Sequence, residues 1–311
     1  MQITPKNFES RSLDDWQLAF YDLYGGIDRD LPLYDIMLQI VADSTRIAEA
    51  MRRGSYDAAL PYIPHVFSWL CSMTSKVARN QAEYRDLGGD KKLSDLIWHK
   101  FPGVCAFCAE AKCKCPSIHV DAMSREERDS HMKDVAGQLD AARLKKRPSE
   151  LNDWVEMFEN IYGTVNASRS SAEKTFHFLE EIGEVEVELR KADRQQEDLR
   201  TGGKTAKIEW EDEVADVFSW LTAVYLHLRG VVYDLERLVN AFEVLGETKK
   251  SRRIRSRAMP VTAKPLPVKL EPMLSFSHWV WLEFGNRDGE GLRCHRCEKH
   301  PKCGCKMATR R

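Results

Sequence analysis

The chain has 311 residues, of which 43% are hydrophobic and 31% are charged, and its formal net charge is −1. This composition is typical of a folded protein with a hydrophobic core and argues against a disordered chain. No stretch approaches the roughly 18 consecutive apolar residues of a membrane helix, and the first residues lack the apolar core of a signal peptide. We therefore expect a cytoplasmic protein with no membrane partner.

An internal repeat organises the sequence. Leu13–Gly25 (LDDWQLAFYDLYG) corresponds position by position to Leu151–Gly163 (LNDWVEMFENIYG). The pentapeptide VFSWL begins at Val66 and again at Val217, and each copy ends in a tryptophan-containing segment followed by four cysteines. The repeat predicts two modules in tandem with a charged connector between them. The predicted parts are residues 1–120, 121–150 and 151–311.

Secondary structure is predicted to be helical almost throughout, because apolar residues recur at i, i+3, i+4 and i+7 and seldom alternate. The pattern is clearest in Phe176–Lys191, Trp210–Leu228 and Val231–Leu245. We expect an all-α fold in which each module is a helical bundle. A basic and proline-rich segment near residues 250–273 is predicted to be an irregular loop.

Two predicted helices of the second module each carry an acidic pair. Glu181 and Glu184 are separated by one helical turn, as are Glu213 and Asp216, so each pair shares one helix face. Asp216 lies on an apolar stripe, where an unpaired carboxylate would cost on the order of several kcal/mol. Four carboxylates directed into a bundle repel one another unless cations neutralise them, and oxygen ligands of this kind suit Mg²⁺ or Mn²⁺. The alternative interpretation of such a motif is a solvated helix face.

The arrangement of EExxE at Glu180–Glu184, followed by ExxD at Glu213–Asp216 and an apolar run, resembles the MazG-like all-α nucleoside triphosphate pyrophosphohydrolases. The resemblance covers residues 151–235 well and residues 13–120 as a degenerate copy. It implies an Mg²⁺-dependent hydrolase that converts NTPs or dNTPs to the monophosphate and pyrophosphate. By position, the magnesium ligands would be Glu181, Glu184, Glu213 and Asp216. Glu180 and Glu181 would be the catalytic carboxylates, with Glu180 a further ligand or the base for the attacking water.

Basic and aromatic residues near the acidic helices are candidates for substrate binding. They are Arg190, Lys191, Lys204, Lys207 and Trp220. The cations would contact phosphate groups, and the alternative is that they are solvated surface charges. Trp220, one turn after Asp216, would either stack on a base or pack in the core.

The first module lacks the acidic set. Its aligned positions hold Asp43, Arg46, Tyr62 and His65, and Arg46 places a permanent positive charge where a cation should bind. We expect a non-catalytic half in which these residues form either a non-metal site or a neutralised core patch. Active sites of the resembled family form between protomers, which implies an intrachain pseudo-dimer whose first half completes the bundle and lines the base pocket. Because active sites of that family form between protomers, two copies of this chain could also form a homodimer.

Eight of the nine cysteines form two groups, with spacing C-x2-C-x4-C-x-C in the first and C-x2-C-x5-C-x-C in the second. Four thiolates so close in sequence suit a tetrahedral Zn²⁺ site with a structural role. An iron–sulfur cluster or redox thiols are the alternatives. The predicted zinc ligands are Cys105, Cys108, Cys113 and Cys115 in the first group, and Cys294, Cys297, Cys303 and Cys305 in the second.

The sequence thus favours an Mg²⁺-dependent nucleoside triphosphate pyrophosphohydrolase with two structural zinc sites. The alternative is a non-catalytic nucleotide-binding or scaffold protein built as a pseudo-dimer. Nucleic-acid binding through the cysteine groups and the basic segment Lys249–Arg257 is disfavoured by the near-neutral net charge.

Overall fold

The computed structural model describes residues 3–80, 83–87, 90–115, 124–201, 207–244, 275–285, 291–297, 299, 302–303 and 305. Every regular element in these ranges is a helix, and the β-bridges among them are isolated, which confirms the all-α prediction for this part of the chain. None of the described helices is long and apolar enough to span a membrane. The elements are η1 (Phe8–Ser10), α1 (Leu13–Asp28), α2 (Leu33–Arg52), α3 (Tyr56–Ala59), α4 (Tyr62–Arg79), η2 (Arg85–Leu87), α5 (Leu93–Lys100), α6 (Arg125–Arg143), α7 (Leu151–Ser168), α8 (Ser171–Thr201), α9 (Trp210–Val244) and α11 (Phe276–Phe284).

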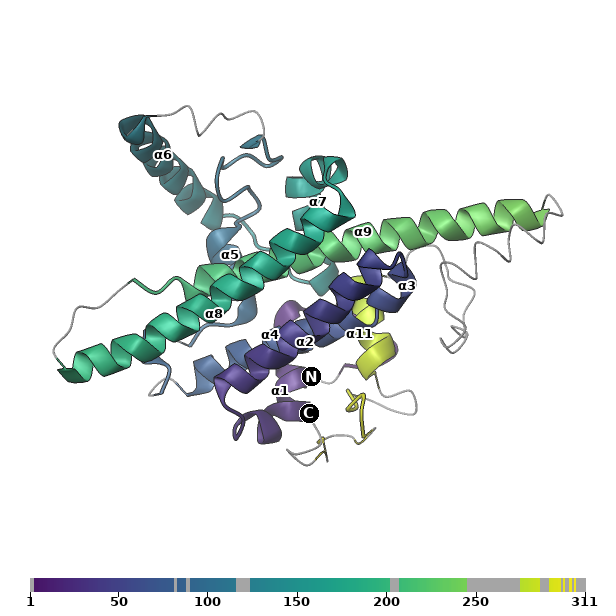
Figure 1. The fold of residues 1–311 in the computed structure, drawn as a ribbon, viewed down its shortest axis with the longest axis horizontal. Coiled ribbons are helices and arrows are strands. Elements are labelled where there is room, and N and C mark those ends of the chain that lie inside the picture. The colour runs from purple at the N-terminus through teal and green to yellow at the C-terminus, as the bar shows by residue number, and fades with distance from the viewer. Residues whose placement is uncertain are drawn as a thin grey trace.

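Helix α9, which carries Glu213 and Asp216, is one continuous helix. It joins the two stretches of helical periodicity Trp210–Leu228 and Val231–Leu245, although Leu245 itself lies outside the described residues. Gly230 lies inside this helix, and a Cβ at that position would meet nothing within 4 Å. Helices α8 and α9 pack along each other as the two longest elements of the molecule (Figure 1). This pairing brings the two acidic motifs face to face.

Both repeats begin their first helix in a similar way. The Ser12 hydroxyl accepts a hydrogen bond from the Asp15 N–H at 3.0 Å, and the Asp15 carboxylate accepts one from the Ser12 N–H at 3.2 Å, so the two residues cap α1 reciprocally. At the start of α7, the Asp153 carboxylate accepts a hydrogen bond from the Glu150 N–H at 3.0 Å. Ser12 and Glu150, which occupy equivalent positions in the two repeats, also pair with each other in an isolated antiparallel bridge. The two repeat starts therefore lie side by side.

The two halves share one hydrophobic core. Phe67 of α4 and Phe218 of α9, which occupy the same position in the two VFSWL pentapeptides, are fully buried and lie 6.1 Å apart between ring centroids. Phe67 also contacts Phe20 of α1 at 5.9 Å, and Phe218 contacts Phe158 of α7 at the same distance. The two sides of the Phe67–Phe218 pair therefore make equivalent contacts.

The segments that carry the cysteines cross from one half to the other. The Cys113 N–H donates to the carbonyl of Ile161 in α7 at 2.8 Å, and the Cys303 N–H donates to the carbonyl of Leu23 in α1 at 3.0 Å. Leu23 and Ile161 occupy equivalent positions in the repeat, so the two hydrogen bonds are equivalent. Each cysteine hairpin thus packs against the first helix of the opposite half.

The helices that precede the cysteine hairpins also pack against the opposite half of the chain. Helix α5 packs against α9, and α11 contacts α4. At the end of α5, Phe101 lies 5.2 Å from Phe158, and at the end of α11, Phe284 lies 5.0 Å from Phe20. Gly103 has φ +77°, a conformation that glycine adopts without strain, and it turns the chain from α5 into the first hairpin.

Candidate functional site

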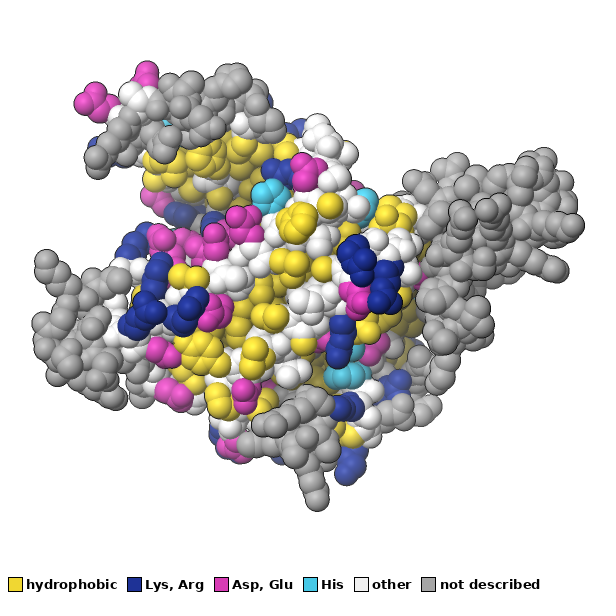
Figure 2. Space-filling view, viewed as in Figure 1, with side chains coloured by type: hydrophobic (Ala, Val, Ile, Leu, Met, Phe, Trp, Pro, Cys, Tyr) yellow, Lys and Arg dark blue, Asp and Glu magenta, His cyan; other side chains and the backbone are white. Residues whose placement is uncertain are grey.

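Three of the predicted metal ligands converge between α8 and α9. Glu181 of α8 and Glu213 and Asp216 of α9 are half-buried, and their ligand oxygens all lie within 4.8 Å of one another. Glu184 is exposed at the edge of this group, and its charge contributes, after burial, to the raised pKa of Glu213. Figure 2 shows acidic side chains gathered beside the hollow beneath α6. The structure therefore brings three of the four predicted carboxylates together, with Glu184 beside them, and we call these four residues the acidic cluster.

The acidic cluster holds more negative charge than its surroundings balance. Burial, followed by the charges of Asp216, Glu184 and Glu213, raises the pKa of Glu181 to about 8. Burial is also the main cause that raises the pKa of Glu213 to about 7 and that of Asp216 to about 6. The nearby positive charge of Lys100 opposes all three shifts. A bound cation would relieve the repulsion among the carboxylates.

Lys100, which was not predicted from the sequence, reaches the cluster from the other half of the chain. Its ammonium group donates to the Asp216 carboxylate and, at 3.3 Å, to the carbonyl of Asp212. Burial lowers the pKa of Lys100, but the charges of Asp216, Asp212 and Glu213 together outweigh it and the net shift is upward. Because Lys100 ends α5, it reaches α9 only through the exchange of hairpins between the halves, and no local sequence pattern signals that exchange.

The site in the first half has the opposite arrangement of charge. Asp43 accepts a hydrogen bond from Arg46 at 2.7 Å, and His65 pairs with Glu283 of α11 at 2.8 Å. Glu283 and Lys100 are aligned in the repeat, as are His65 and Asp216, so a histidine–glutamate pair stands where the second half has an aspartate–lysine pair. Burial alone would raise the pKa of Glu283, but His65 holds it below its ordinary value.

Tyr62 completes this first-half network. Its ring lies under the Arg46 guanidinium at 5.5 Å and packs edge-on against His65 at 5.9 Å. These contacts agree with a neutralised patch, in which each charge has a partner of opposite sign or an aromatic face.

Trp220 lies next to the acidic cluster and, half-buried, also packs against the hydrophobic core. Its indole N–H donates to Glu181 at 3.1 Å, and its ring stacks on His177 at 4.7 Å between centroids. The Arg169 guanidinium lies 5.0 Å from the ring centroid. A base that stacked on Trp220 would compete with His177 and Arg169 for the faces of its ring. Base stacking on Trp220 therefore stays a prediction.

The other predicted site residues lie apart from the cluster or outside the described residues. Glu180 is exposed and pairs with His177 at 3.0 Å. Each described lysine or arginine of the predicted substrate-binding set pairs with a neighbouring glutamate: Arg190 with Glu186, Lys191 with Glu188, and Lys207 with Glu209. Lys204 lies outside the described residues.

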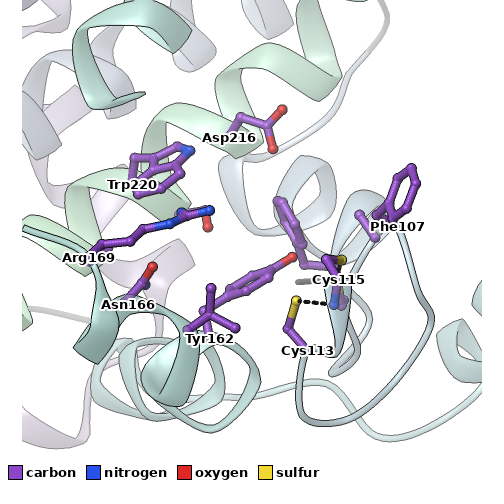
Figure 3. Close-up of a pocket in the computed structure, with 14 residues that line it drawn as sticks. Phe107, Cys113, Cys115, Tyr162, Asn166, Arg169, Asp216 and Trp220 are labelled. Carbon is purple, nitrogen blue, oxygen red and sulfur yellow. Dashed lines mark hydrogen bonds between the residues drawn. The ribbon is translucent and has the colours of Figure 1, made fainter. Parts of the chain in front are cut away.

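A cavity of about 580 Å³ opens beside the cluster (Figure 3). It lies between the first cysteine hairpin and helices α7 and α9, and Asp216 and Trp220 form part of its wall. Arg169, the residue that follows α7, points into it. The lining residues are Phe101, Cys105, Ala106, Phe107, Cys113, Cys115, Tyr162, Val165, Asn166, Arg169, Asp216, Ser219, Trp220 and Ala223.

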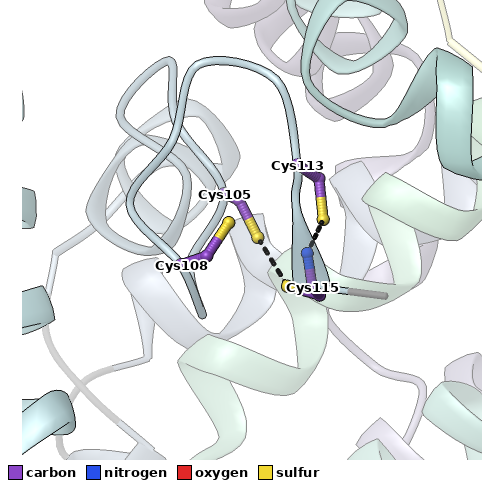
Figure 4. Close-up of side chains that lie close together, drawn as sticks. All are labelled: Cys105, Cys108, Cys113 and Cys115. Atoms are coloured by element: carbon purple, nitrogen blue, oxygen red, sulfur yellow. Dashed lines mark hydrogen bonds between the residues drawn. The ribbon is translucent and has the colours of Figure 1, made fainter. Parts of the chain in front are cut away.

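Each predicted group of four cysteines is assembled in space, and Figure 4 shows the first of them. Within each group, the four Sγ atoms lie within 4.8 Å of one another. Sγ–Sγ distances are 3.6 Å for Cys105 and Cys115, and 3.8 Å for Cys294 and Cys305. A tetrahedral zinc ion with Zn–S bonds of about 2.3 Å separates its sulfur ligands by about 3.8 Å, so either group could hold such an ion. None of the nine cysteines, all of which lie in the described part of the chain, forms a disulfide.

Comparisons of this chain with protein-family models, with curated proteins and with solved structures find no match. The function must therefore be inferred from the site.

Proposed function

We propose that the chain is an Mg²⁺-dependent nucleoside triphosphate pyrophosphohydrolase with one active site, located in the second half. The observation that carries this proposal is the acidic cluster, where Glu181, Glu213 and Asp216 offer ligand oxygens within 4.8 Å of one another. Burial, followed by the charges of the neighbouring carboxylates, raises the pKa of each of these groups. A protein that served only as a scaffold would gain nothing from carboxylates held so close together.

The donor set fits magnesium or manganese. All its ligand atoms are carboxylate oxygens, which hard divalent cations prefer, and the partly exposed position leaves room for water and phosphate oxygens. Among the described residues, Lys100 is the cation that contacts the cluster, and one ammonium charge cannot balance four carboxylates. Glu181, Glu213 and Asp216 would hold the ion, and Glu184 would join them from the exposed edge.

The proposed reaction is attack by water on the α-phosphorus of a nucleoside triphosphate. The bond between this phosphorus and the α–β bridging oxygen breaks, pyrophosphate leaves, and a carboxylate of the cluster accepts the proton of the attacking water. When bound, the magnesium ion would neutralise phosphate charge and acidify water. Lys100 keeps Asp216 ionised and oriented, and the Trp220 N–H orients Glu181.

Two structural zinc sites complete the proposal. The first would hold the hairpin that forms one wall of the cavity, and the second would hold the equivalent hairpin against α1. A site with four thiolate ligands has no open coordination position and is structural.

The test is pyrophosphate release from a panel of NTPs and dNTPs with Mg²⁺, with Glu181→Gln and Asp216→Asn as site variants. We expect at least one nucleotide to yield the monophosphate and pyrophosphate, and both variants to lose about 100-fold or more in rate, because each removes a charged metal ligand. Glu186→Gln is the matched control, since Glu186 lies on the same helix but pairs with Arg190. Nucleotide binding without turnover would favour the non-catalytic alternative.

A further inference from the structure

The cavity beside the acidic cluster has the size and lining of a ligand pocket. Its volume of about 580 Å³ lies within the range of about 300 to 1,000 Å³ for small-molecule sites. Phe101 and Phe107 of the first hairpin, together with Tyr162 and Val165 of α7, give it an apolar wall. Asp216 connects the cavity to the cluster, so a molecule bound there would extend directly to the metal-binding carboxylates.

Arg169 is the cation that lines this cavity. Its guanidinium lies over the Trp220 ring and forms no ion pair with any described carboxylate, although its charge contributes to lowering the pKa of the exposed Glu173. The predicted cations Arg190, Lys191 and Lys207 differ, because each pairs with a glutamate. An arginine without a carboxylate partner, directed into a cavity, is suited to bind an anion through two parallel hydrogen bonds.

The position of Arg169 relative to the cluster indicates which anion it would bind. Trp220 contacts Glu181 through its indole N–H and Arg169 through its ring, so the guanidinium and the carboxylates lie on different parts of one side chain. A phosphate chain held at the cluster would therefore pass close to Arg169. The anionic chain also needs this positive charge, because the carboxylates themselves repel it.

Two residues of this lining differ, in identity or in burial, at the equivalent described positions of the first half. The residue aligned with Arg169 is Leu31, and Trp69, aligned with Trp220, is 7% exposed. The polar lining of the cavity and the acidic cluster thus occur in the same half.

We infer that the cavity is a nucleotide pocket shared by the two halves, in which Arg169 of the second half binds the phosphate chain and the first cysteine hairpin provides the wall for the nucleoside. This inference rests on the proposed function, since it places the substrate of that reaction. It assigns a role to Arg169, which was not among the phosphate contacts predicted from the sequence.

The test measures binding of a nucleoside, its monophosphate and its α,β-methylene triphosphate to the full-length protein by calorimetry with Mg²⁺. The methylene group replaces the oxygen whose bond would break, so binding is measured without turnover. For the wild type we expect affinity to increase with the number of phosphates. Arg169→Met should weaken triphosphate binding about 10- to 100-fold, as expected for loss of hydrogen bonds to a charged group, and leave nucleoside binding unchanged.

Two further variants make the outcome specific. Arg229→Met is the matched control and should bind like the wild type, because Arg229 pairs with Glu159 and lies over Tyr225 outside the cavity. Phe107→Ala, with all cysteines retained, should weaken binding of the nucleoside and the triphosphate by the same factor.

Two results would overturn the assignment while leaving the proposed activity intact: triphosphate binding by Arg169→Met equal to that of the wild type, or equal losses for nucleoside and triphosphate in that variant. Wild-type protein that binds no nucleotide would overturn both the inference and the proposed function.

Discussion

At the scale of single residues, the acidic cluster makes stability depend on pH. The pKa of Glu181 is about 8 in the folded protein against an ordinary value of 4.5. Between these values the folded chain retains a proton that the unfolded chain has released, so the contribution of this group to stability is present below about pH 4.5 and is lost as the pH rises towards 8. A neutral side chain at position 181 would not lose this stability as the pH rises.

We therefore expect Glu181→Gln to become more stable relative to the wild type as the pH rises from 5 to 8 without divalent cations. The expected gain is about 1 to 2 kcal/mol, after allowance for solvent screening of this partly exposed group. Urea unfolding of both proteins at the two pH values measures it, and Glu186→Gln should follow the wild type. Parallel pH profiles for the wild type and Glu181→Gln would contradict the charge repulsion described here.

The ammonium group of Lys100 balances part of the negative charge of the acidic cluster. Replacing it by methionine leaves Asp216 without its ionic partner in a mostly buried position, so we expect Lys100→Met to lose about 1 to 3 kcal/mol at pH 8 without divalent cations. Mn²⁺ should then raise the melting temperature of Lys100→Met more than that of the wild type. Lys91→Met is the control, because Lys91 also pairs across the halves, with Glu211, but is exposed. Equal Mn²⁺ shifts in all three proteins would exclude a role for Lys100 at the metal site.

At the scale of elements, the helical periodicity predicted the helices that carry the acidic cluster, because each exposes one polar face and buries one apolar face. It left open whether Trp210–Leu228 and Val231–Leu245 belong to one helix, since a glycine between two apolar runs lowers the local preference for a helix. The fold overrides this local preference by extending one helix along α8.

The continuity of α9 predicts the effect of one substitution. Gly230→Ala should stabilise the protein by about 0.5 to 1 kcal/mol, because alanine favours the helix and its methyl group meets no neighbour. Thermal or urea unfolding measures this change. Destabilisation would instead indicate a break in the helix at this position.

The exchange of cysteine hairpins gives a second prediction at this scale. Cys115→Ser and Cys305→Ser should each reduce bound zinc from two equivalents to one, as metal analysis can measure. Only the loss of the first site should weaken nucleotide binding, by about 10-fold or more, because the first hairpin lines the cavity whereas the second lies against α1. Equal effects of the two variants on nucleotide binding would contradict this assignment.

At the scale of the whole molecule, the structure pairs two similar halves that differ in charge at equivalent places. The repeat, the acidic motifs and the cysteine groups are local patterns, so the sequence was sufficient to predict them. The contacts of Lys100 with Asp216 and of Glu283 with His65 join positions that are far apart in the chain. They depend on which half each hairpin packs against, and periodicity carries no information about that choice. Arg169 was missed for a related reason, since its role follows from a cavity that exists only after the halves assemble.

The central claim is that a divalent cation binds in the second half and not at the equivalent place in the first. The most direct measurement is Mn²⁺ binding by electron paramagnetic resonance to the wild type, Asp216→Asn and Asp43→Asn, where Asp43 is aligned with Glu181 and pairs with Arg46. We predict that Asp216→Asn weakens Mn²⁺ binding about 10-fold or more and that Asp43→Asn binds like the wild type. Unchanged binding by Asp216→Asn, or loss of binding in Asp43→Asn alone, would contradict the claim.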